Sequence, residues 1–113
     1  MAQIRDFYGK PLLTIENNEI RDFYGRVQYR IRGDEICDFY GRCLYRIRGD
    51  EICDFYGRVQ YRVDTDCIKD FYGRVLYRYD NEYIKSPELR ILYKIEGFLG
   101  RKSLCALITI IDN

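Results

Sequence analysis

Apolar and polar residues alternate along most of this chain. In the segment CLYRIR, Cys43, Tyr45 and Ile47 would lie on one side of an extended backbone, and the intervening residues, two arginines among them, on the other. A period of two predicts a β-strand with one buried face and one solvated face. We therefore expect the first, third and fifth residues of this segment to point into a core.

The pattern restarts every 16 residues, and an isoleucine before each turn marks the interval from Ile4 to Ile84. Such internal repetition indicates a repeat architecture. Each unit holds a short strand built on the isoleucine and the longer alternating strand, so each repeat predicts one β-hairpin. The single domain 1–113 then consists of repeats 4–19, 20–35, 36–51, 52–67, 68–83 and a degenerate 84–99, followed by a tail, 100–113.

Two kinds of turn separate these strands. The first is Asp-x-x-Gly, as in DFYG from Asp38 to Gly41. An Asp at the first position can accept backbone N–H bonds, and a Gly at the fourth can adopt a positive φ, so this word fits a type I turn. The second kind, RGDE in two repeats and ENNE in the first, suits a two-residue hairpin loop. Such frequent reversals predict an all-β antiparallel meander.

A parallel β-solenoid with one repeat per rung is the competing architecture. It would stack identical aspartates and arginines of successive repeats about 4.8 Å apart, and like charges directly opposed destabilise a sheet. We therefore favour the meander. About twelve strands exceed what an open twisted sheet normally holds, so we expect them to curl into a barrel or a flower-like array. The apolar tail, 100–113, is expected to add a last strand that covers an edge or plugs the centre.

The repeat I-x-D-F-Y-G-R-V-x-Y-R-I-x-G-D-E resembles bacterial β-hairpin repeats built on Asp-x-x-Gly turns, such as the beta-flower proteins, and more distantly the YD repeats of large toxins. The resemblance covers residues 4–83 well and 84–113 poorly. It implies an all-β array, often of unknown function, and it transfers no catalytic residue.

Composition excludes several kinds of chemistry. The chain has no histidine, so a Ser-His-Asp centre, a Cys-His centre or a His-bearing zinc site cannot be built from it. No phosphate-loop or dinucleotide glycine pattern occurs. Acidic pairs such as Asp34 and Glu35 are expected to be solvated turn residues rather than catalytic or calcium-binding groups. We expect a protein that is not an enzyme and that has no cofactor and no metal.

Charge and cysteine content give further expectations. The 19 Lys and Arg residues against 18 Asp and Glu give a net charge of +1, which provides no global attraction to nucleic acid or to an anionic membrane. Without a signal-like start or a long apolar run, we expect no membrane association and a cytoplasmic location. The five cysteines form no CxxC and predict neither a disulfide framework nor a zinc knuckle. We expect Cys43, in a valine position, to be buried, and Cys37 and Cys53, in the positions of Arg21 and Lys69, to be exposed.

Aromatic pairs occupy the two central positions of the Asp-x-x-Gly turns, where polar residues are usual. If the turns fold inward, the pairs close one end of the array as core, and we favour this arrangement. If they are exposed, they form an apolar rim of the kind that marks a contact. The candidate rim residues are Phe23, Tyr24, Phe39, Tyr40, Phe55, Tyr56, Phe71 and Tyr72, with Phe7 and Tyr8 as a fifth pair.

An arginine follows the glycine of four of these turns: Arg26, Arg42, Arg58 and Arg74. These side chains are candidate anion contacts, although each unit carries nearly as many acids, and ion pairing is the favoured alternative.

The favoured function is a non-enzymatic structural or protein-interaction repeat module, with the Phe-Tyr pairs as contacts. The alternative is binding of nucleic acid or an anionic glycan through the arginines and aromatic rings. A second copy of the chain is a candidate partner, because an unclosed array would leave strand edges free.

Overall fold

The strands of this protein follow the repeat, two to each unit. The computed structural model describes residues 1–112, with twelve strands and one helix. Their bounds are β1 Ala2–Asp6, β2 Pro11–Glu16, β3 Glu19–Asp22, β4 Val27–Arg32, β5 Glu35–Asp38, β6 Cys43–Arg48, β7 Glu51–Asp54, β8 Val59–Val63, β9 Cys67–Asp70, β10 Val75–Tyr79, β11 Tyr83–Lys85, β12 Ile91–Gly97 and α1 Arg101–Ile111.

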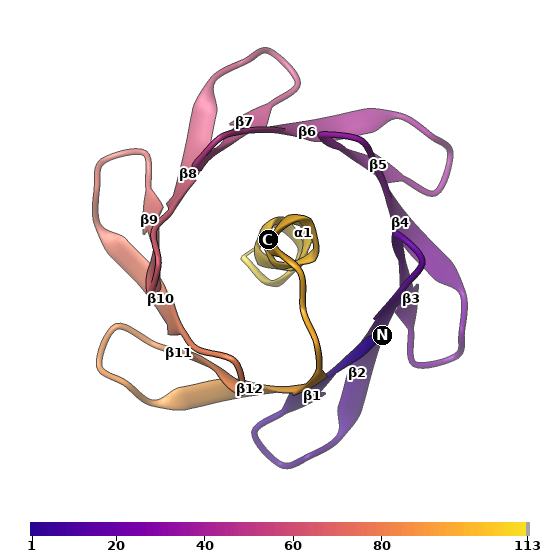
Figure 1. The fold of residues 1–113 in the computed structure, drawn as a ribbon, viewed down its shortest axis with the longest axis vertical. Helices are drawn as coiled ribbons and strands as arrows, with labels where there is room; N and C mark the ends of the chain where they lie inside the picture. Colours follow the sequence, from indigo (N-terminus) through magenta and orange to yellow (C-terminus); the bar gives the residue numbers. More distant parts are fainter. Residues whose placement is uncertain (113) are drawn as a thin grey trace.

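The sheet is a closed antiparallel barrel in which each strand pairs with its neighbours in sequence and β1 pairs with β12. The predicted meander is therefore confirmed. Figure 1 shows a ring from which the hairpins project outward like petals. Closure leaves no free edge, so edge pairing no longer supports self-association.

Backbone hydrogen bonds also join successive repeats at the second kind of turn, the two-residue loops between one hairpin and the next, which we call the inner turns. The amide of Ile31 donates to the carbonyl of Asn18 at 2.8 Å, and the same bond recurs one repeat later from Ile47 to Asp34 at 2.7 Å. In the first inner turn Asn17 and Asn18 both have positive φ, as a type I′ turn requires, whereas in the next two only the glycine, Gly33 or Gly49, has positive φ. Each repeat is thus fixed to the next by strand pairing and by this additional bond.

Inward-facing side chains form three stacked layers. The middle layer, the isoleucine ring, is fully buried and comprises Ile4, Ile20, Ile36, Ile52, Ile68 and Ile84. Each of its members pairs across the sheet with one residue of each outer layer, for example Ile36 with Ile31 and with Tyr45. The repeating isoleucine is therefore the centre of the core.

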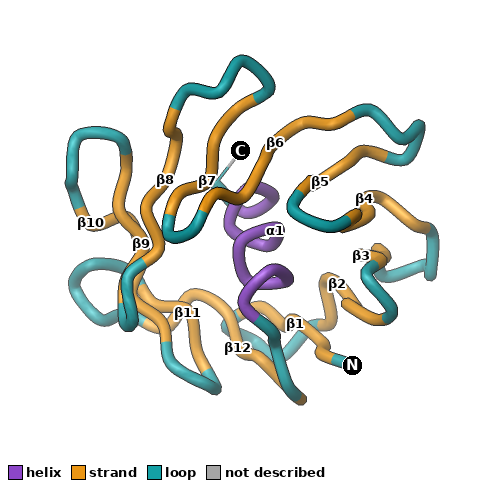
Figure 2. Tube along the Cα trace, turned by 45° about the horizontal axis from the view of Figure 1, so that its top comes forward, coloured by secondary structure: helices purple, strands orange, loops and turns teal. Residues whose placement is uncertain are grey.

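The C-terminal tail is a helix, so the predicted last strand is wrong. In Figures 1 and 2, α1 stands in the middle of the ring, and Leu104 to Thr109 are buried in succession. A closed barrel offers no edge to pair with. A segment inside it must satisfy its own N–H and C=O groups, which an α-helix does. The tail does plug the centre, as one of the two expected roles required.

Ion pairs and hydrogen bonds hold both ends of this helix. Arg101 contacts the Asp50 carboxylate at 2.6 Å, and Lys102 contacts that of Asp34 at 3.3 Å. Cations in a first helical turn are unfavourable beside the positive end of the helix dipole, and these turn acids offset them. At the opposite end, the Asp112 carboxylate follows the last helical turn and accepts hydrogen bonds from the hydroxyls of Tyr61 and Tyr77. No helix in residues 1–112 has the length and apolar character needed to cross a membrane.

A β-bulge corrects the expectation that residues such as Cys43 point inward. The register shifts so that Tyr45 pairs with Ile36 and Cys43 with Cys37, which leaves Leu44 as an extra residue. Paired residues share a face of the sheet, and successive residues of β5 alternate. Because Ile36 points inward, Cys43 and Cys37 share the outer face. Equivalent shifts occur in the other hairpins.

Burial of the cysteines also differs from expectation. All five thiols are free, Cys43 is only half-buried, and Cys37 and Cys53 are buried. In the register, Cys37 lies between Arg30 on β4 and Cys43 on β6. The Cys37 side chain is short enough to be covered by these neighbours. At the equivalent position in the second repeat, the longer Arg21 side chain extends past its own neighbours and donates to the Gly25 carbonyl at 2.9 Å.

Candidate binding surface

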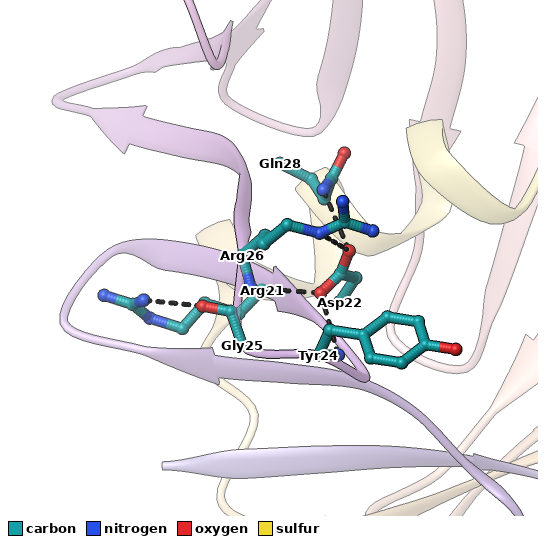
Figure 3. Close-up of polar contacts among 6 residues, drawn as sticks. All are labelled: Arg21, Asp22, Tyr24, Gly25, Arg26 and Gln28. Carbon is teal, nitrogen blue, oxygen red and sulfur yellow. Dashed lines mark hydrogen bonds and ion pairs between the residues drawn. The ribbon is translucent and has the colours of Figure 1, made fainter.

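The Asp-x-x-Gly words form the outer turns, at the tips of the projecting hairpins. In the second hairpin, Asp22 Oδ1 accepts the amides of Tyr24 at 2.9 Å and Arg26 at 3.0 Å, and the Gly25 amide donates to the Asp22 carbonyl at 3.0 Å (Figure 3). Gly25 has a φ of 83°. This is a type I turn followed by a left-handed residue, as in three-residue hairpin loops. The predicted role of Asp and Gly is confirmed.

All six hairpin tips share this backbone, but the sixth has different residues. The same carbonyl bond to the glycine amide is made by Asp6, Asp22, Asp38, Asp54 and Asp70. In the last hairpin, Ser86 replaces the aspartate, and Leu89 takes the positive φ at 71°. The candidate surface therefore has five copies.

The aromatic pairs are exposed, so the expectation that they pack as core is wrong. The phenylalanines are 54–61% exposed and the tyrosines 78–90%. Within each pair the two rings meet edge to face, with centroids 5.2–5.5 Å apart. The hairpins project away from the barrel, so the aromatic side chains at their tips lie in solvent. We call these five pairs the aromatic tips: Phe7–Tyr8, Phe23–Tyr24, Phe39–Tyr40, Phe55–Tyr56 and Phe71–Tyr72.

The arginine after each glycine completes four of the tips. Its Nε lies 2.8–3.1 Å from Oδ2 of the turn aspartate, and its guanidinium lies over the tip tyrosine, 5.5–5.6 Å from the ring centroid. The side chains are still 72–76% exposed. The ion pairing expected for Arg26, Arg42, Arg58 and Arg74 is thus present.

The strand arginines are paired as well. Arg30 contacts Glu19 at 3.3 Å, and Arg62 contacts Glu51 at 3.2 Å, each across a strand pair. Most of the charge on the outer surface is therefore matched by an opposite charge close by.

The carboxyls of the second to fifth tips have a pKa below the ordinary aspartate value. Burial acts to raise the pKa of Asp38, but hydrogen bonds from the Arg42 amide and side chain, the Arg42 charge and the Tyr40 amide together lower it. Asp22, Asp54 and Asp70 show the same lowered pKa, with the same kinds of group responsible. Each of these tips therefore carries one anion and one cation and has no net charge.

Grooves lie between neighbouring hairpins. One, of about 490 Å³, has Arg26, Val27 and Gln28 on one side and Phe39 and Tyr40 on the other. Grooves of about 260 and 300 Å³ have the same plan, with the second strand of one hairpin facing the tip of the next. The bulge contributes directly, because it turns Val27 to the outer face. The ring thus repeats one kind of groove.

The turn acids at the inner end have a different role from the one expected. Asp34 and Asp50 pair with the first turn of α1 rather than being only solvated. Asp64 contacts Lys69 at 3.1 Å. Within residues 1–112, no three His, Cys, Asp or Glu side chains gather as a metal site would require.

Two contacts could not be anticipated from the repeat. Gln28 and Gln60, at the bulge, donate to the tip carboxylates of Asp22 and Asp54. The only signal was that glutamine alternates with leucine at this position. The hydroxyls of Tyr61 and Tyr77 donate to Asp112 at 2.7 and 3.0 Å, a contact that depends on the helix.

Comparison of the chain with protein-family models, curated proteins and solved structures gave no match. The fold itself defines the class: a closed ring of hairpin repeats around a central helix.

Proposed function

We propose that this protein is a non-enzymatic binding module whose aromatic tips hold a protein partner at several points. The observation that carries the proposal is the exposure of five Phe-Tyr pairs on outward-projecting hairpins. Ten large aromatic rings in water are unfavourable unless a partner covers them, and exposed apolar patches usually mark contacts.

The tips are rigid as well as exposed. In the third hairpin the Asp38 carboxylate holds the amides of Tyr40 and Arg42, and the rings of Phe39 and Tyr40 contact each other. A preorganised surface loses little conformational entropy on binding. Tyrosine and arginine are also the residue types that contribute most to binding at protein interfaces.

Charge favours a protein over a polyanion. Nucleic acids and anionic glycans bind chiefly through net positive charge, which releases counterions. Here each arginine-bearing tip is neutral, because Arg42, for example, is paired through its Nε with Asp38. Binding of nucleic acid or an anionic glycan is therefore the less favoured alternative, and the experiment below includes it as an outcome.

Repetition favours a partner that presents several similar apolar side chains. Grooves of 260–490 Å³ suit individual side chains rather than a folded domain. When one groove is filled, the next is reached at high effective concentration, so that weak contacts sum to a stable complex.

A displayed random-peptide library provides the test. We expect enrichment of peptides with spaced apolar or aromatic residues, and tighter binding by a tandem peptide than by a single copy. Replacing the tyrosines of the second to fifth tips by serine should weaken binding at least tenfold. The matched control is Phe98→Ser, which removes an aromatic side chain that is 82% exposed but lies outside the tips.

Two results would overturn the proposal. One is selection of the same peptides by the wild type and by the tip variant. The other is retention on heparin or single-stranded DNA that falls steeply with salt, with no peptide enrichment, which would favour the polyanion alternative.

A further inference from the structure

The third hairpin is the one place in the described chain, residues 1–112, where the strand register sets two cysteines opposite each other. Cys37 on β5 pairs with Cys43 on β6. At the corresponding positions, Arg21 faces Val27 and Cys53 faces Val59. The pair therefore arises from two separate departures from the repeat that meet at one site.

The geometry of this position suits a disulfide. The adjacent pair toward the turn is hydrogen-bonded, with the Asp38 amide donating to the Arg42 carbonyl at 2.9 Å. Hydrogen-bonded and non-hydrogen-bonded pairs alternate along an antiparallel ladder, so Cys37 and Cys43 form a pair of the closer kind, with Cα atoms about 4.5 Å apart. Disulfides span Cα separations of about 4.4–6.8 Å. Register partners also point to the same face of the sheet.

The two thiols differ in access. Cys43 is half-buried, so a small reagent can reach it, whereas Cys37 is fully buried. Burial raises the pKa of the Cys43 thiol, and Arg46 beside it opposes this effect in part. Thiolate formation at Cys43, and with it attack on a disulfide, should therefore be faster in mildly alkaline buffer.

We propose that Cys37 and Cys43 are a redox modification site, which a low-molecular-weight disulfide converts into an intramolecular disulfide. Cys43 thiolate attacks one sulfur of the reagent, forming a mixed disulfide and releasing one small thiolate. Cys37 thiolate then attacks the Sγ of Cys43 and releases the second. The protein loses two protons and two electrons, and the reagent takes them up as two thiols.

The cross-link would join the two strands at the pair next to the turn that carries the Phe39–Tyr40 tip. It would close a loop between residues 37 and 43, leaving the tip itself in place. Oxidation would therefore stiffen one of the five tips and distinguish the third repeat from its neighbours.

The test is oxidation of the folded protein with oxidised glutathione, alkylation of the remaining thiols, tryptic digestion and mass spectrometry without reduction. Cleavage after Arg42 separates the two cysteines, so the cross-link joins peptide 33–42 to peptide 43–46. Peptides 33–42 and 49–58 have identical sequences, so variants must identify the partner. We expect the linked species in the wild type and in Cys53→Ser, and its loss in Cys37→Ser.

Any of three outcomes would overturn the proposal: a linked species that persists in Cys37→Ser, one that disappears in Cys53→Ser, or stable glutathionylation of Cys43 with Cys37 still alkylatable after unfolding. A constructive variant tests the geometry separately. Val59→Cys places a thiol opposite Cys53 in the next repeat, and it should allow a second cross-link between peptides 49–58 and 59–62. Circular dichroism of each reduced variant checks that the ring has folded.

Discussion

Replacing Leu107 by alanine tests whether α1 is a structural part of the core. Leu107 is completely buried near the middle of the helix and packs in the same cluster as the isoleucine ring. Removing its outer carbon atoms takes apolar surface out of the core without touching the tips or the strand register. We expect a large loss of stability and an unchanged fold.

The magnitude has two parts. Leucine buries three more carbon groups than alanine, so the substitution loses about 2.4 kcal/mol of burial free energy, at ~0.8 kcal/mol for each group. A residual cavity of roughly 75 Å³, at ~24 cal/mol per Å³, adds about 2 kcal/mol. The cavity term should be nearly complete, because every strand is hydrogen-bonded on both sides and the closed ring cannot move inward. The free energy of unfolding should therefore fall by about 4 kcal/mol.

Urea denaturation followed by far-UV circular dichroism measures this quantity. The matched control is Leu89→Ala, the same substitution at a position that is 61% exposed, where we expect a change within about 0.5 kcal/mol. A loss at Leu107 below about 2 kcal/mol, less than the transfer term alone, would refute the argument that the helix fills a rigid ring.

Three further measurements address the turns and the tyrosines. Gly41→Ala should cost about 1 kcal/mol, because a φ of 85° is unfavourable for alanine although its added Cβ would meet no atom within 4 Å; no change on urea denaturation would mean that the turn relaxes to another type. Because the pKa of Asp22, Asp38, Asp54 and Asp70 is lowered in the folded protein, their contribution to stability is complete above the unfolded aspartate pKa of about 3.9 and is lost as the pH falls through their folded pKa values. Acid unfolding monitored by circular dichroism should therefore be less steep when these four aspartates are asparagine, and an unchanged curve would contradict this. Burial and the bonds to Asp112 raise the pKa of Tyr61 and Tyr77. The contribution of these two groups to stability is therefore present below the ordinary tyrosine pKa of about 10 and is lost as the pH rises through their folded pKa values. Absorbance titration should show both ionising at higher pH than the tip tyrosines, and Asp112→Asn should lower both pKa values.

The repeat period and turn chemistry were enough to predict the meander of hairpins. Asp38 and Gly41 have roles that depend only on local backbone geometry, and each recurs in the five tips. The antiparallel arrangement of the strands was favoured over a parallel solenoid because a solenoid would have stacked identically charged residues of successive repeats on one another. These inferences succeeded because each concerns residues close together in sequence or related by the repeat.

The tail could not be predicted in the same way. Leu104 to Ile111 has a composition compatible with either a strand or a buried helix, and its periodicity is obscured because it is apolar almost throughout. What decides between them is whether a strand edge is free, and this depends on closure between β1 and β12, which lie at opposite ends of the chain. The contacts of Asp112 with Tyr61 and Tyr77 were hidden for the same reason.

The bulge explains both the wrong inward assignment of Cys43 and the shape of the proposed grooves. A strict period of two assumes that no residue is inserted, but Leu44 and its equivalents are extra residues beside the turn. Without the bulge, Val27 would face the core and the groove beside Phe39 would lose one wall. The insertion keeps Tyr29 and Tyr45 in the core and also frees a small side chain for the outer surface.

The same comparison between repeats bears on the purpose of the aromatic tips. Positions at the bulge vary among the central repeats, as Val27 against Cys43 and Gln28 against Leu44 show, yet the Phe-Tyr pair is identical in all five tips. Turn geometry does not require it, because Asp22 and Gly25 already satisfy the backbone. Core packing does not require it either, since the rings are exposed. The partner contact proposed above would account for large apolar side chains at these positions, and the tip variants test it.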